Sequence, residues 1–598
     1  MVVSEKNSNF ATNYTPTTMA VPLLLNMKNK STLGLYILSV INLLVMHYYI
    51  MTTCRLEEAT DAVLWIDNLL GIVIDITIVG TITLLFTWGR LRISLFITAI
   101  ITLLWSFSNV LYSRFFHHYI SISAISQTGT LADGFMLQNV AEGIKWFDFL
   151  FLALGIAAIE LYYMSRKEKT SIKKRHLLVT WPACLIIADV VYHLIFCLVT
   201  PGLASASYYQ HRLAVRHWGL LHSSAEPNWA SFHRGSLRQL LIPQIYQAFT
   251  TTELTEEQRK AIETEYKRHE GRTSDTTKKI NDKNIIFIIV ESYLSVTSDL
   301  IVDGREVTPF LNSLKRDSTV YFNGQLTSNI SIGESSDGQF LYMAGMLPLR
   351  SEVTVTKAKN AELPGLPKLL KQEQIIKEAH MVIPTLPSMW EQESMCQRYG
   401  FDHLYSSADY EEGKYWYLTD RQIFEYALQK NMEAPKPFLS VELTMTMHQP
   451  YNEPKDSTFI IRDSSLTEKY RNYLSTCHYT DQQIKWYFGK LKEEGLYDNS
   501  IIVIVADHHA HPSLFEMKEE EMSIDIPLYI INGGINNATA WDGRCNQLDV
   551  YTTLLDIVGT KDNWHGFGHT LITKDYHNSI KPELWTMSEE IVIGKYFN

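Results

Sequence analysis

The sequence predicts a multi-span α-helical membrane domain followed by an α/β domain with a mostly parallel central sheet. Three observations lead to this fold class. Long apolar runs gather in the first third of the 598 residues. From Asn284 onward, short β-branched segments alternate with helical patterns, as in parallel α/β sheets. Two of these segments, Asn284–Val290 and Ser500–Ala506, are almost entirely apolar, which is typical of strands buried on both faces.

The apolar runs of the first third predict about five transmembrane helices. Each run is long enough to cross a hydrocarbon core of roughly 30 Å. The predicted spans are residues 32–50, 64–88, 93–112, 147–164 and 177–200. Because further spans follow the first one, we do not expect it to be a cleaved signal peptide.

Basic residues between the spans predict the orientation. Residues 165–175 are strongly basic, Arg90 and Arg92 mark another short loop, and Lys28 and Lys30 precede the first span. Such residues favour the cytoplasmic side. With an odd number of spans, we expect a cytoplasmic tail at 1–30, a membrane domain at 31–200, a juxtamembrane connector at 201–283 and an extracytoplasmic catalytic domain at 284–598.

Ionisable residues fall inside the predicted spans. These are Asp75, Glu160 and Asp189, with His193 one turn after Asp189. Charged groups inside a membrane are expensive to bury and often functional. The alternative interpretation is a polar pair that holds two helices together.

The overall charge and the cysteines exclude some classes of protein. A net charge of −11 with no basic stripe argues against a nucleic-acid partner. The six cysteines are scattered and have no metal-ligand spacing.

The soluble part is predicted element by element from its periodicity. After the first strand, further strands are expected at residues 381–383, 438–442, 501–505 and 528–531. Helices are expected at residues 336–346, 468–494 and 548–558. A helical pattern near residues 253–270 belongs to the connector.

Metal-binding side chains follow two of the predicted strands. Glu291 comes directly after the first strand, and Asp507 and His508 follow the strand that ends at Ala506. In open α/β sheets, ligands bind at the carboxyl ends of the strands. Two carboxylates and an imidazole at one edge predict a divalent metal. The alternative is that the strands simply end in polar residues.

Ser335 is a candidate nucleophile. It lies in the turn Gly333-Glu-Ser-Ser-Asp337, which leads into a helical pattern. A helix N-terminus favours a phosphate group, and a bound metal would activate the hydroxyl. The alternative is that Ser335 or Ser336 only caps the helix.

These motifs resemble a known family. From Asn284 to the end, the chain resembles lipoteichoic acid synthases and related phosphoglycerol and phosphoethanolamine transferases of the alkaline phosphatase/sulfatase superfamily. The resemblance rests on Val290-Glu-Ser292, on Gly333-Glu-Ser-Ser-Asp337, on Thr444-Met-Thr-Met-His-Gln-Pro-Tyr451, on residues 495–508 and on residues 548–559. It implies a sulfatase-like catalytic domain after about five spans.

The resemblance also implies roles for individual residues. Glu291, Asp507 and His508 would bind a divalent metal (Mn²⁺, Zn²⁺ or Mg²⁺), Ser335 would be nucleophile and ligand, and His448 would contact the phosphate. Trp390 and Gln392 lie where the family contacts the headgroup. In the family, glycine commonly follows the Asp-His pair or lies one residue on, whereas this chain has Asp507-His-His-Ala-His511. His509 and His511 are candidates for binding substrate or a second metal, and the alternative is that they are solvated loop residues.

The chain departs from the family pattern at several positions. The family nucleophile is usually threonine, and here it is Ser335. Gln392 replaces an arginine, so the headgroup stays open between phosphoglycerol and phosphoethanolamine. Residues 335–339 lack the proline and arginine of true sulfatases, which argues against hydrolysis of sulfate esters.

The expected function is transfer of a phospho-headgroup from a phospholipid to an envelope glycan or lipid through a phosphoserine intermediate. The resemblance implies a multi-pass protein of a bacterial cytoplasmic membrane. One alternative is a membrane-tethered phosphodiesterase or phosphatase of the same superfamily. Another is a degenerate enzyme that serves as a binding protein.

Overall fold

The chain forms two compact units. In the computed structural model, the described residues are 30–53, 62–116, 119–120, 144–167, 236–241, 253–268, 279–331, 333–350, 353–415, 417–449, 451, 456–510, 514, 525–560, 566–578 and 580–598. The first unit comprises residues 1–120, 143–223 and 228–243, and the second comprises 121–142, 224–227 and 244–598.

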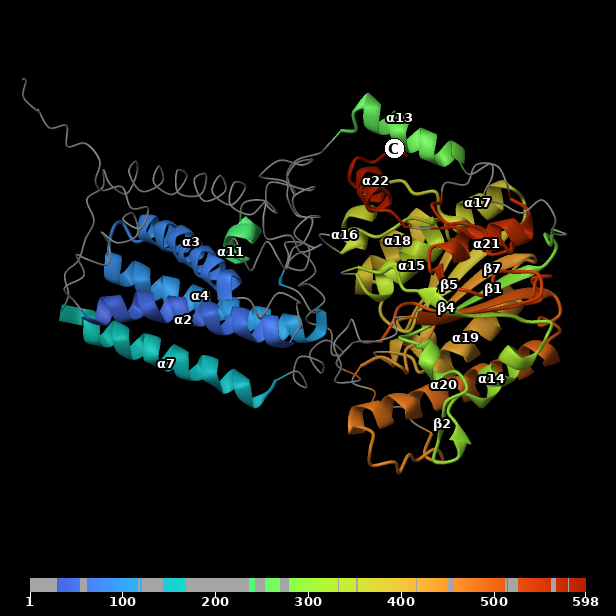
Figure 1. The fold of residues 1–598 in the computed structure, drawn as a ribbon, viewed down its shortest axis with the longest axis horizontal. Coiled ribbons are helices and arrows are strands. Elements are labelled where there is room, and N and C mark those ends of the chain that lie inside the picture. The colour runs from blue at the N-terminus through green and yellow to red at the C-terminus, as the bar shows by residue number, and fades with distance from the viewer. Residues whose placement is uncertain are drawn as a thin grey trace, which may run out of the picture. The chain divides into compact units, whose positions relative to one another are not determined.

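The first unit is helical (Figure 1). Its longer helices are α2 (Lys30–Thr53), α3 (Ala62–Phe86), α4 (Leu91–Phe116) and α7 (Phe149–Met164). Short 3-10 turns flank α7 at Trp146–Asp148 and Ser165–Lys167, and α11 spans Ser236–Gln239. Helix α2 packs against α4 and α7, and α3 packs against α4.

Three described helical segments are long and apolar enough to cross a membrane. They are Lys30–Ile50, Leu91–Arg114 and Trp146–Met164, and they match three of the predicted spans. The predicted span at 64–88 corresponds to α3, in which Gly71–Phe86 is a shorter apolar segment. The predicted span at 177–200, with Asp189 and His193, lies outside the described residues.

Asp75 in the middle of α3 is fully buried and bonded to a distant segment of the chain. Its carboxylate accepts hydrogen bonds from the backbone N–H groups of Leu237 (3.0 Å) and Arg238 (2.7 Å) and from the Ser236 hydroxyl (3.2 Å). Asp75 therefore attaches α11 to α3, and these three donors satisfy its carboxylate. Glu160 on α7 is exposed.

The second unit is built around one eight-stranded sheet with the order β10-β4-β9-β8-β1-β7-β5-β6. The strands are β1 (Asn284–Val290), β4 (Tyr321–Thr327), β5 (Glu378–Val382), β6 (His403–Tyr405), β7 (Phe438–Leu443), β8 (Ser500–Ala506), β9 (Asp525–Ile531) and β10 (Cys545–Asn546). Only the pairs of β9 with β8 and with β4 are antiparallel, so the sheet is mostly parallel. A small hairpin, β2 (Ile301–Val302) and β3 (Arg305–Glu306), lies apart from the sheet.

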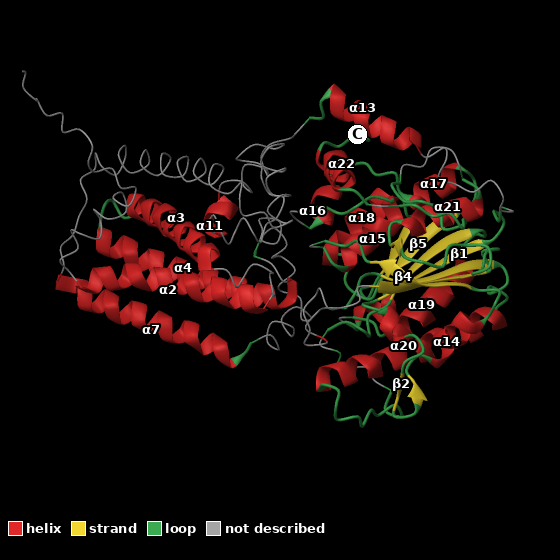
Figure 2. Ribbon diagram, viewed as in Figure 1, coloured by secondary structure: helices red, strands yellow, loops and turns green. Residues whose placement is uncertain are grey.

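Helices cover both faces of this sheet (Figures 1 and 2). One face carries α15 (Ser335–Ala344), α17 (Leu366–Gln372), α18 (Gln392–Tyr399) and α21 (Asp549–Val558); the other carries α14 (Pro309–Arg316), α19 (Asp420–Glu433) and α20 (Glu468–Glu493). The unit also contains α13 (Glu256–Lys267), α16 (Thr354–Ala358) and α22 (Pro582–Ile593). Every residue of β1 and β8 is buried, which explains why these strands are apolar without alternation.

The predicted strands and helices correspond to β1, β5, β7, β8, β9, α15, α20 and α21. Strand β4 was not predicted, because its sequence Tyr-Phe-Asn-Gly-Gln-Leu-Thr interrupts the apolar residues with amides and a glycine. The helical pattern near 253–270 forms α13, whose Gln258 donates a hydrogen bond to Glu590 on α22 (2.9 Å). Cys396, Cys477 and Cys545 are buried and form no disulfide.

Glu442 of β7 is a fully buried carboxyl group between β7, α19 and α20. Its Oε1 accepts hydrogen bonds from Tyr487 (2.7 Å), Asn431 (2.9 Å) and Ser440 (3.0 Å). Burial raises the pKa of Glu442 to about 7, against 4.5 for a free glutamate. The folded protein therefore keeps this proton to a higher pH than the unfolded chain does. As a result, the free energy of unfolding decreases as the pH rises from 4.5 to about 7.

We predict that Glu442→Gln reduces this loss of stability. An amide imitates the protonated carboxyl and cannot ionise. The variant therefore avoids the loss of folding free energy, up to roughly 3 kcal/mol, that wild type undergoes between pH 4.5 and about 7. The check is the melting temperature of wild type and variant at pH 5 and pH 8. The difference between the proteins should shift in favour of the variant at pH 8, whereas the exposed control Glu257→Gln should show no such shift.

Candidate metal and nucleophile site

Two neighbouring parallel strands bring acidic side chains to the same edge of the sheet. Val290 at the end of β1 lies opposite Ala506 at the end of β8. The next residues, Glu291 and Asp507, are therefore adjacent, and the backbone N–H of Asp507 donates to the carbonyl of Val290 (3.2 Å). On the other side of β1, the N–H of Glu291 donates to the hydroxyl of Thr444, which follows β7 (3.0 Å).

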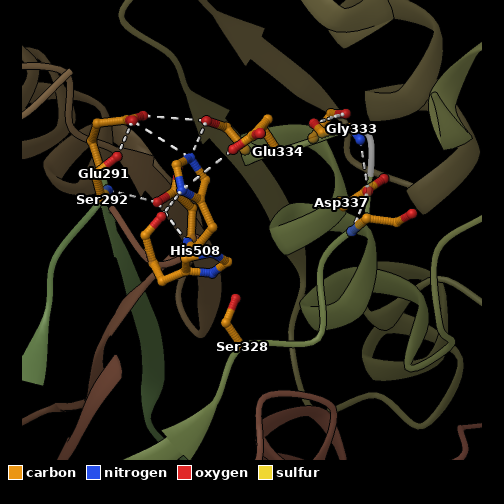
Figure 3. A network of polar contacts seen from close by, with 12 residues as sticks. Glu291, Ser292, Ser328, Gly333, Glu334, Asp337 and His508 are labelled. Carbon is orange, nitrogen blue, oxygen red and sulfur yellow. Dashed lines mark hydrogen bonds and ion pairs between the residues drawn. The ribbon is translucent and has the colours of Figure 1, made fainter. Parts of the chain in front are cut away.

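Glu291, Asp507 and His508 form one buried cluster. Each offers a metal-ligand atom, and these atoms lie within 4.8 Å of one another. The Nε2 atom of His508 is 3.4 Å from Asp507 Oδ2 and 3.6 Å from Glu291 Oε1. Figure 3 shows the side chains of Glu291 and His508 pointing toward each other.

A backbone contact sets the orientation of the His508 ring. Its Nδ1 lies 2.7 Å from the carbonyl oxygen of His509, which can only accept, so Nδ1 carries the hydrogen. Nε2 therefore faces the two carboxylates and is the atom available to a metal. In metal-binding histidines, the ring nitrogen that does not bind the metal usually donates such a hydrogen bond, which fixes the orientation of the ring.

The cluster carries a charge distribution that suits a cation. Burial, together with the negative charge of Glu291, raises the pKa of Asp507 to about 7. Burial alone would disfavour a charged imidazole, but the neighbouring carboxylates outweigh it and raise the pKa of His508 to about 9. A positive ion between these side chains would stabilise the ionised form of the buried Asp507 carboxylate, so the three residues fit a divalent metal.

Ser292 links the two carboxylates of the cluster. Its backbone adopts a positive φ of 49°, which is uncommon outside glycine. In this conformation its N–H donates to Asp507 Oδ1 (2.8 Å) and its hydroxyl donates to Glu291 Oε1 (2.8 Å). The sequence alone carries no signal for this role of Ser292, because its contribution depends on a backbone angle that the residue type does not encode.

Ser335 lies at the edge of this cluster. It is the first residue of α15, and its hydroxyl oxygen is 3.3 Å from Glu291 Oε2 and 3.2 Å from His508 Nε2. The helix-capping alternative does not describe it, since Glu334 occupies the N-cap position. The neighbouring Ser336 hydroxyl instead donates to the carbonyl of Gly333 (2.7 Å).

Close packing holds α15 against the end of β8. A Cβ atom at Gly338 would lie only 2.2 Å from the backbone oxygen of Asp507, so only glycine permits this approach. The Gln547 side chain donates to the same oxygen (2.5 Å). The helix with Ser335 and the strand that ends at Asp507 are thus in direct contact.

His448 lies in the loop after β7, near the cluster. Its Nδ1 donates to the carbonyl of Gln449 (2.6 Å). Burial lowers the pKa of His448, and the charges of His508 and Asp507 act on it as well. The lowered pKa favours the neutral imidazole. Because Nδ1 already carries a hydrogen, Nε2 is the atom that can gain a proton.

The remaining predicted residues are placed as follows. Gln392 is buried and donates to Gln339 (3.0 Å), which lies one helical turn after Ser335, while its own Oε1 has no hydrogen-bond partner among the described residues. Trp390 has a positive φ of 50° and packs against the hydrophobic core. Burial and the charge of His508 lower the pKa of His509 to about 4. His511 lies outside the described residues.

Comparisons with known proteins agree with this architecture. Residues 283–560 match the family model "Sulfatase", and residues 20–221 match the "Lipoteichoic acid synthase N-terminal domain". The chain is 26% identical over 499 residues to lipoteichoic acid synthase 2 of Bacillus subtilis, covering 79% of this chain and 73% of that protein. It is 24% identical over 531 residues to the lipoteichoic acid synthase of Staphylococcus aureus, covering 82% and 77%.

A solved structure of similar arrangement is a lipoteichoic acid synthase from Listeria monocytogenes, with 19% identity and a TM-score of 0.43 over 53% of this chain and 80% of that one. The two family models follow each other along the chain and together account for its membrane helices and its sulfatase-type sheet. The chain is a lipoteichoic acid synthase-like member of the alkaline phosphatase/sulfatase superfamily.

Proposed function

We propose that this protein transfers a phospho-headgroup, phosphoglycerol or phosphoethanolamine, from a membrane phospholipid to an envelope glycan or lipid. One observation carries the proposal. The hydroxyl of Ser335, at a helix N-terminus, lies 3.3 Å from Glu291 and 3.2 Å from His508 within a buried cluster of metal-binding side chains. Relatives that cover most of the chain are named lipoteichoic acid synthases, which supports envelope polymer chemistry.

We assign the metal to Glu291, Asp507, His508 and the Ser335 oxygen. The donors are two carboxylates, one imidazole and one hydroxyl, a set that suits Mn²⁺, Zn²⁺ or Mg²⁺. Such an ion would act as a Lewis acid that polarises the phosphate and lowers the pKa of the serine hydroxyl.

Ser335 is the nucleophile in the first step. Its Oγ forms a bond to phosphorus, the bond from phosphorus to the glycerol oxygen of the lipid breaks, and diacylglycerol leaves with a proton. The headgroup remains on Ser335 as a phosphodiester. An acceptor hydroxyl then attacks the same phosphorus, the bond to Ser335 breaks, and the serine regains its proton.

Several groups surround the position of the phosphate. The N-terminus of α15 presents the positive end of its helix dipole at Ser335. We assign His448 to a phosphate oxygen; because Nδ1 is bound to a carbonyl, His448 would donate there from Nε2 as an imidazolium. Trp390, Gln392, His509 and His511 are assigned to the substrate.

We propose that residues 1–30 are a cytoplasmic tail, 31–200 the membrane domain, 201–283 a connector and 284–598 the extracytoplasmic catalytic domain. The apolar helices of the first unit support anchoring in a membrane, where the phospholipid donor is concentrated. The resemblance favours a bacterial cytoplasmic membrane.

The covalent intermediate provides the test of this function. The full chain in detergent is incubated with Mn²⁺ and either phosphatidylglycerol or phosphatidylethanolamine, and intact-protein and peptide mass spectrometry follow. We expect an adduct on the peptide that contains Ser335, and its mass identifies the headgroup. Release of diacylglycerol without any adduct or transfer would instead favour the phosphodiesterase alternative.

We predict that Ser292→Ala weakens metal binding. The variant loses the hydrogen bond that orients Glu291, and loss of such an outer contact typically lowers metal affinity by about 10–100-fold. Calorimetric titration of the full chain with Mn²⁺ measures the change. Ser295→Ala is the matched control, because the Ser295 hydroxyl has no hydrogen-bond partner among the described residues, and equal affinities for both variants would contradict the role of Ser292.

A further inference from the structure

The turn before Ser335 has an unusual backbone. Glu334 has φ 46° and ψ −121°, a conformation that a residue with a side chain rarely adopts. Such a conformation persists only when surrounding contacts enforce it. Ser335 follows at once, so the contacts that enforce the turn also determine where its hydroxyl points.

Asp337 supplies contacts of this kind. It is fully buried, two residues after Ser335, and its side chain folds back onto the turn. Its Oδ2 accepts the backbone N–H groups of Ser331 (3.0 Å) and Gly333 (2.8 Å). Figure 3 shows this carboxylate beside Gly333, on the opposite side of the turn from His508.

Gly333 makes room for the carboxylate. A Cβ atom at this position would lie 2.3 Å from Asp337 Oδ1, well inside van der Waals contact. The carboxylate is therefore packed directly on the backbone of the turn, and a larger residue would displace it.

Thr354 attaches this arrangement to the next helix. Its hydroxyl donates to Asp337 Oδ1 (2.6 Å) and accepts the backbone N–H of Leu349 (3.0 Å). Thr354 is buried and is the first residue of α16. Both oxygens of Asp337 are therefore hydrogen-bonded, Oδ2 to the turn and Oδ1 to α16.

We propose that Asp337 and Thr354 are positioning residues for the nucleophile. They hold the strained turn so that the Ser335 hydroxyl stays within reach of Glu291 and His508, although neither residue touches substrate or metal. This inference rests on the proposed role of Ser335. It predicts that the pair affects the rate of the chemical step rather than binding of the donor or of the metal.

The test compares three variants of the full chain in detergent. Thr354→Val keeps the shape of threonine but removes the hydroxyl, and Thr354→Ser restores the hydroxyl without the methyl group. Thr356→Val is the matched control, since the Thr356 hydroxyl donates to the backbone carbonyl of Val353, the N-cap residue of the same helix. Diacylglycerol release from phosphatidylglycerol gives kcat and KM, and Mn²⁺ titration gives the metal affinity.

We expect Thr354→Val to lower kcat by about 10–100-fold, because small displacements of reacting groups have effects of this size. KM and the Mn²⁺ affinity should stay within about twofold, and Thr354→Ser should recover most of kcat. An unchanged kcat, or an equal loss in Thr356→Val, would overturn the proposal. Asp337→Asn, whose amide nitrogen cannot accept the Thr354 hydrogen bond, gives a second measurement with the same expected direction.

A chromogenic phosphodiester, bis(p-nitrophenyl) phosphate, separates failure of this inference from failure of the proposed function. If wild type cleaves it but releases no diacylglycerol, the lipid donor is wrong, and the Thr354 comparison is made on the chromogenic ester. If wild type cleaves the ester and Thr354→Val matches it in kcat, the positioning role is wrong. A wild type that is inactive toward both compounds contradicts both.

Discussion

Ser335→Ala is expected to abolish adduct formation and to lower diacylglycerol release by on the order of a thousandfold or more. The variant removes the only hydroxyl that the described residues place within 3.3 Å of both Glu291 and His508. The carboxylates and the imidazole remain, so the metal affinity should fall far less than the rate. Radiolabelled phosphatidylglycerol, with separation of released diacylglycerol, measures the loss.

Ser335→Thr is the control for this experiment. It keeps the hydroxyl and adds one methyl group at a half-buried position, so activity should persist. Diacylglycerol release by Ser335→Ala at the wild-type rate would show that another group attacks the lipid.

Asp507→Asn is expected to have opposite effects on the metal-free and the metal-loaded protein. Asp507 lies beside Glu291, and burial with that neighbouring charge raises the pKa of Asp507 to about 7. The amide removes this repulsion, so the metal-free variant should melt at a higher temperature than wild type. The substitution also removes a metal ligand. The Mn²⁺ affinity should therefore fall by more than about 100-fold, a larger loss than removal of a group that only contacts a ligand would cause.

Melting curves with and without Mn²⁺ measure both effects. A ligand at 100 times its Kd stabilises a folded protein by about 2.7 kcal/mol, and the variant should lose this gain at a concentration that saturates wild type. Asp498→Asn is the control, because Asp498 is exposed and lies in the turn just before β8 begins, far along the strand from Asp507. This variant should behave as wild type. Equal Mn²⁺ stabilisation of Asp507→Asn and wild type would exclude Asp507 as a ligand.

Local sequence signals predicted the parts of the fold that depend on short segments. The strands β1 and β8 are apolar because helices cover both faces of the sheet, and the residues after them are polar because the sheet ends there. The pattern therefore indicated Glu291, Asp507 and His508 as candidate ligands, and the structure places their ligand atoms within 4.8 Å of one another. Their proximity required in addition that β1 and β8 be neighbours, a pairing between segments 216 residues apart that periodicity does not determine.

Other features depend on tertiary contacts and had no local signal. Ser292 and Asp337 are ordinary polar residues in sequence, and their contacts arise from a positive φ in one case and from a folded-back side chain in the other. Strand β4 was missed because it pairs antiparallel to β9 and its residues are only partly buried, which weakens the apolar pattern. The fifth predicted span and His511 lie outside the described residues and stay predictions.

The buried thiols of the second unit have a practical consequence. Cys396, Cys477 and Cys545 are enclosed in the core, and burial raises the pKa of Cys396 to about 12, so the reactive thiolate is scarce at neutral pH. These three thiols are therefore protected from alkylating and oxidising reagents while the unit stays folded. Once Cys54, Cys184 and Cys197 of the remaining chain are replaced, a single cysteine introduced on the surface of this unit would offer a selective attachment point for a fluorophore or spin label, so that the motions of the unit during turnover can be followed.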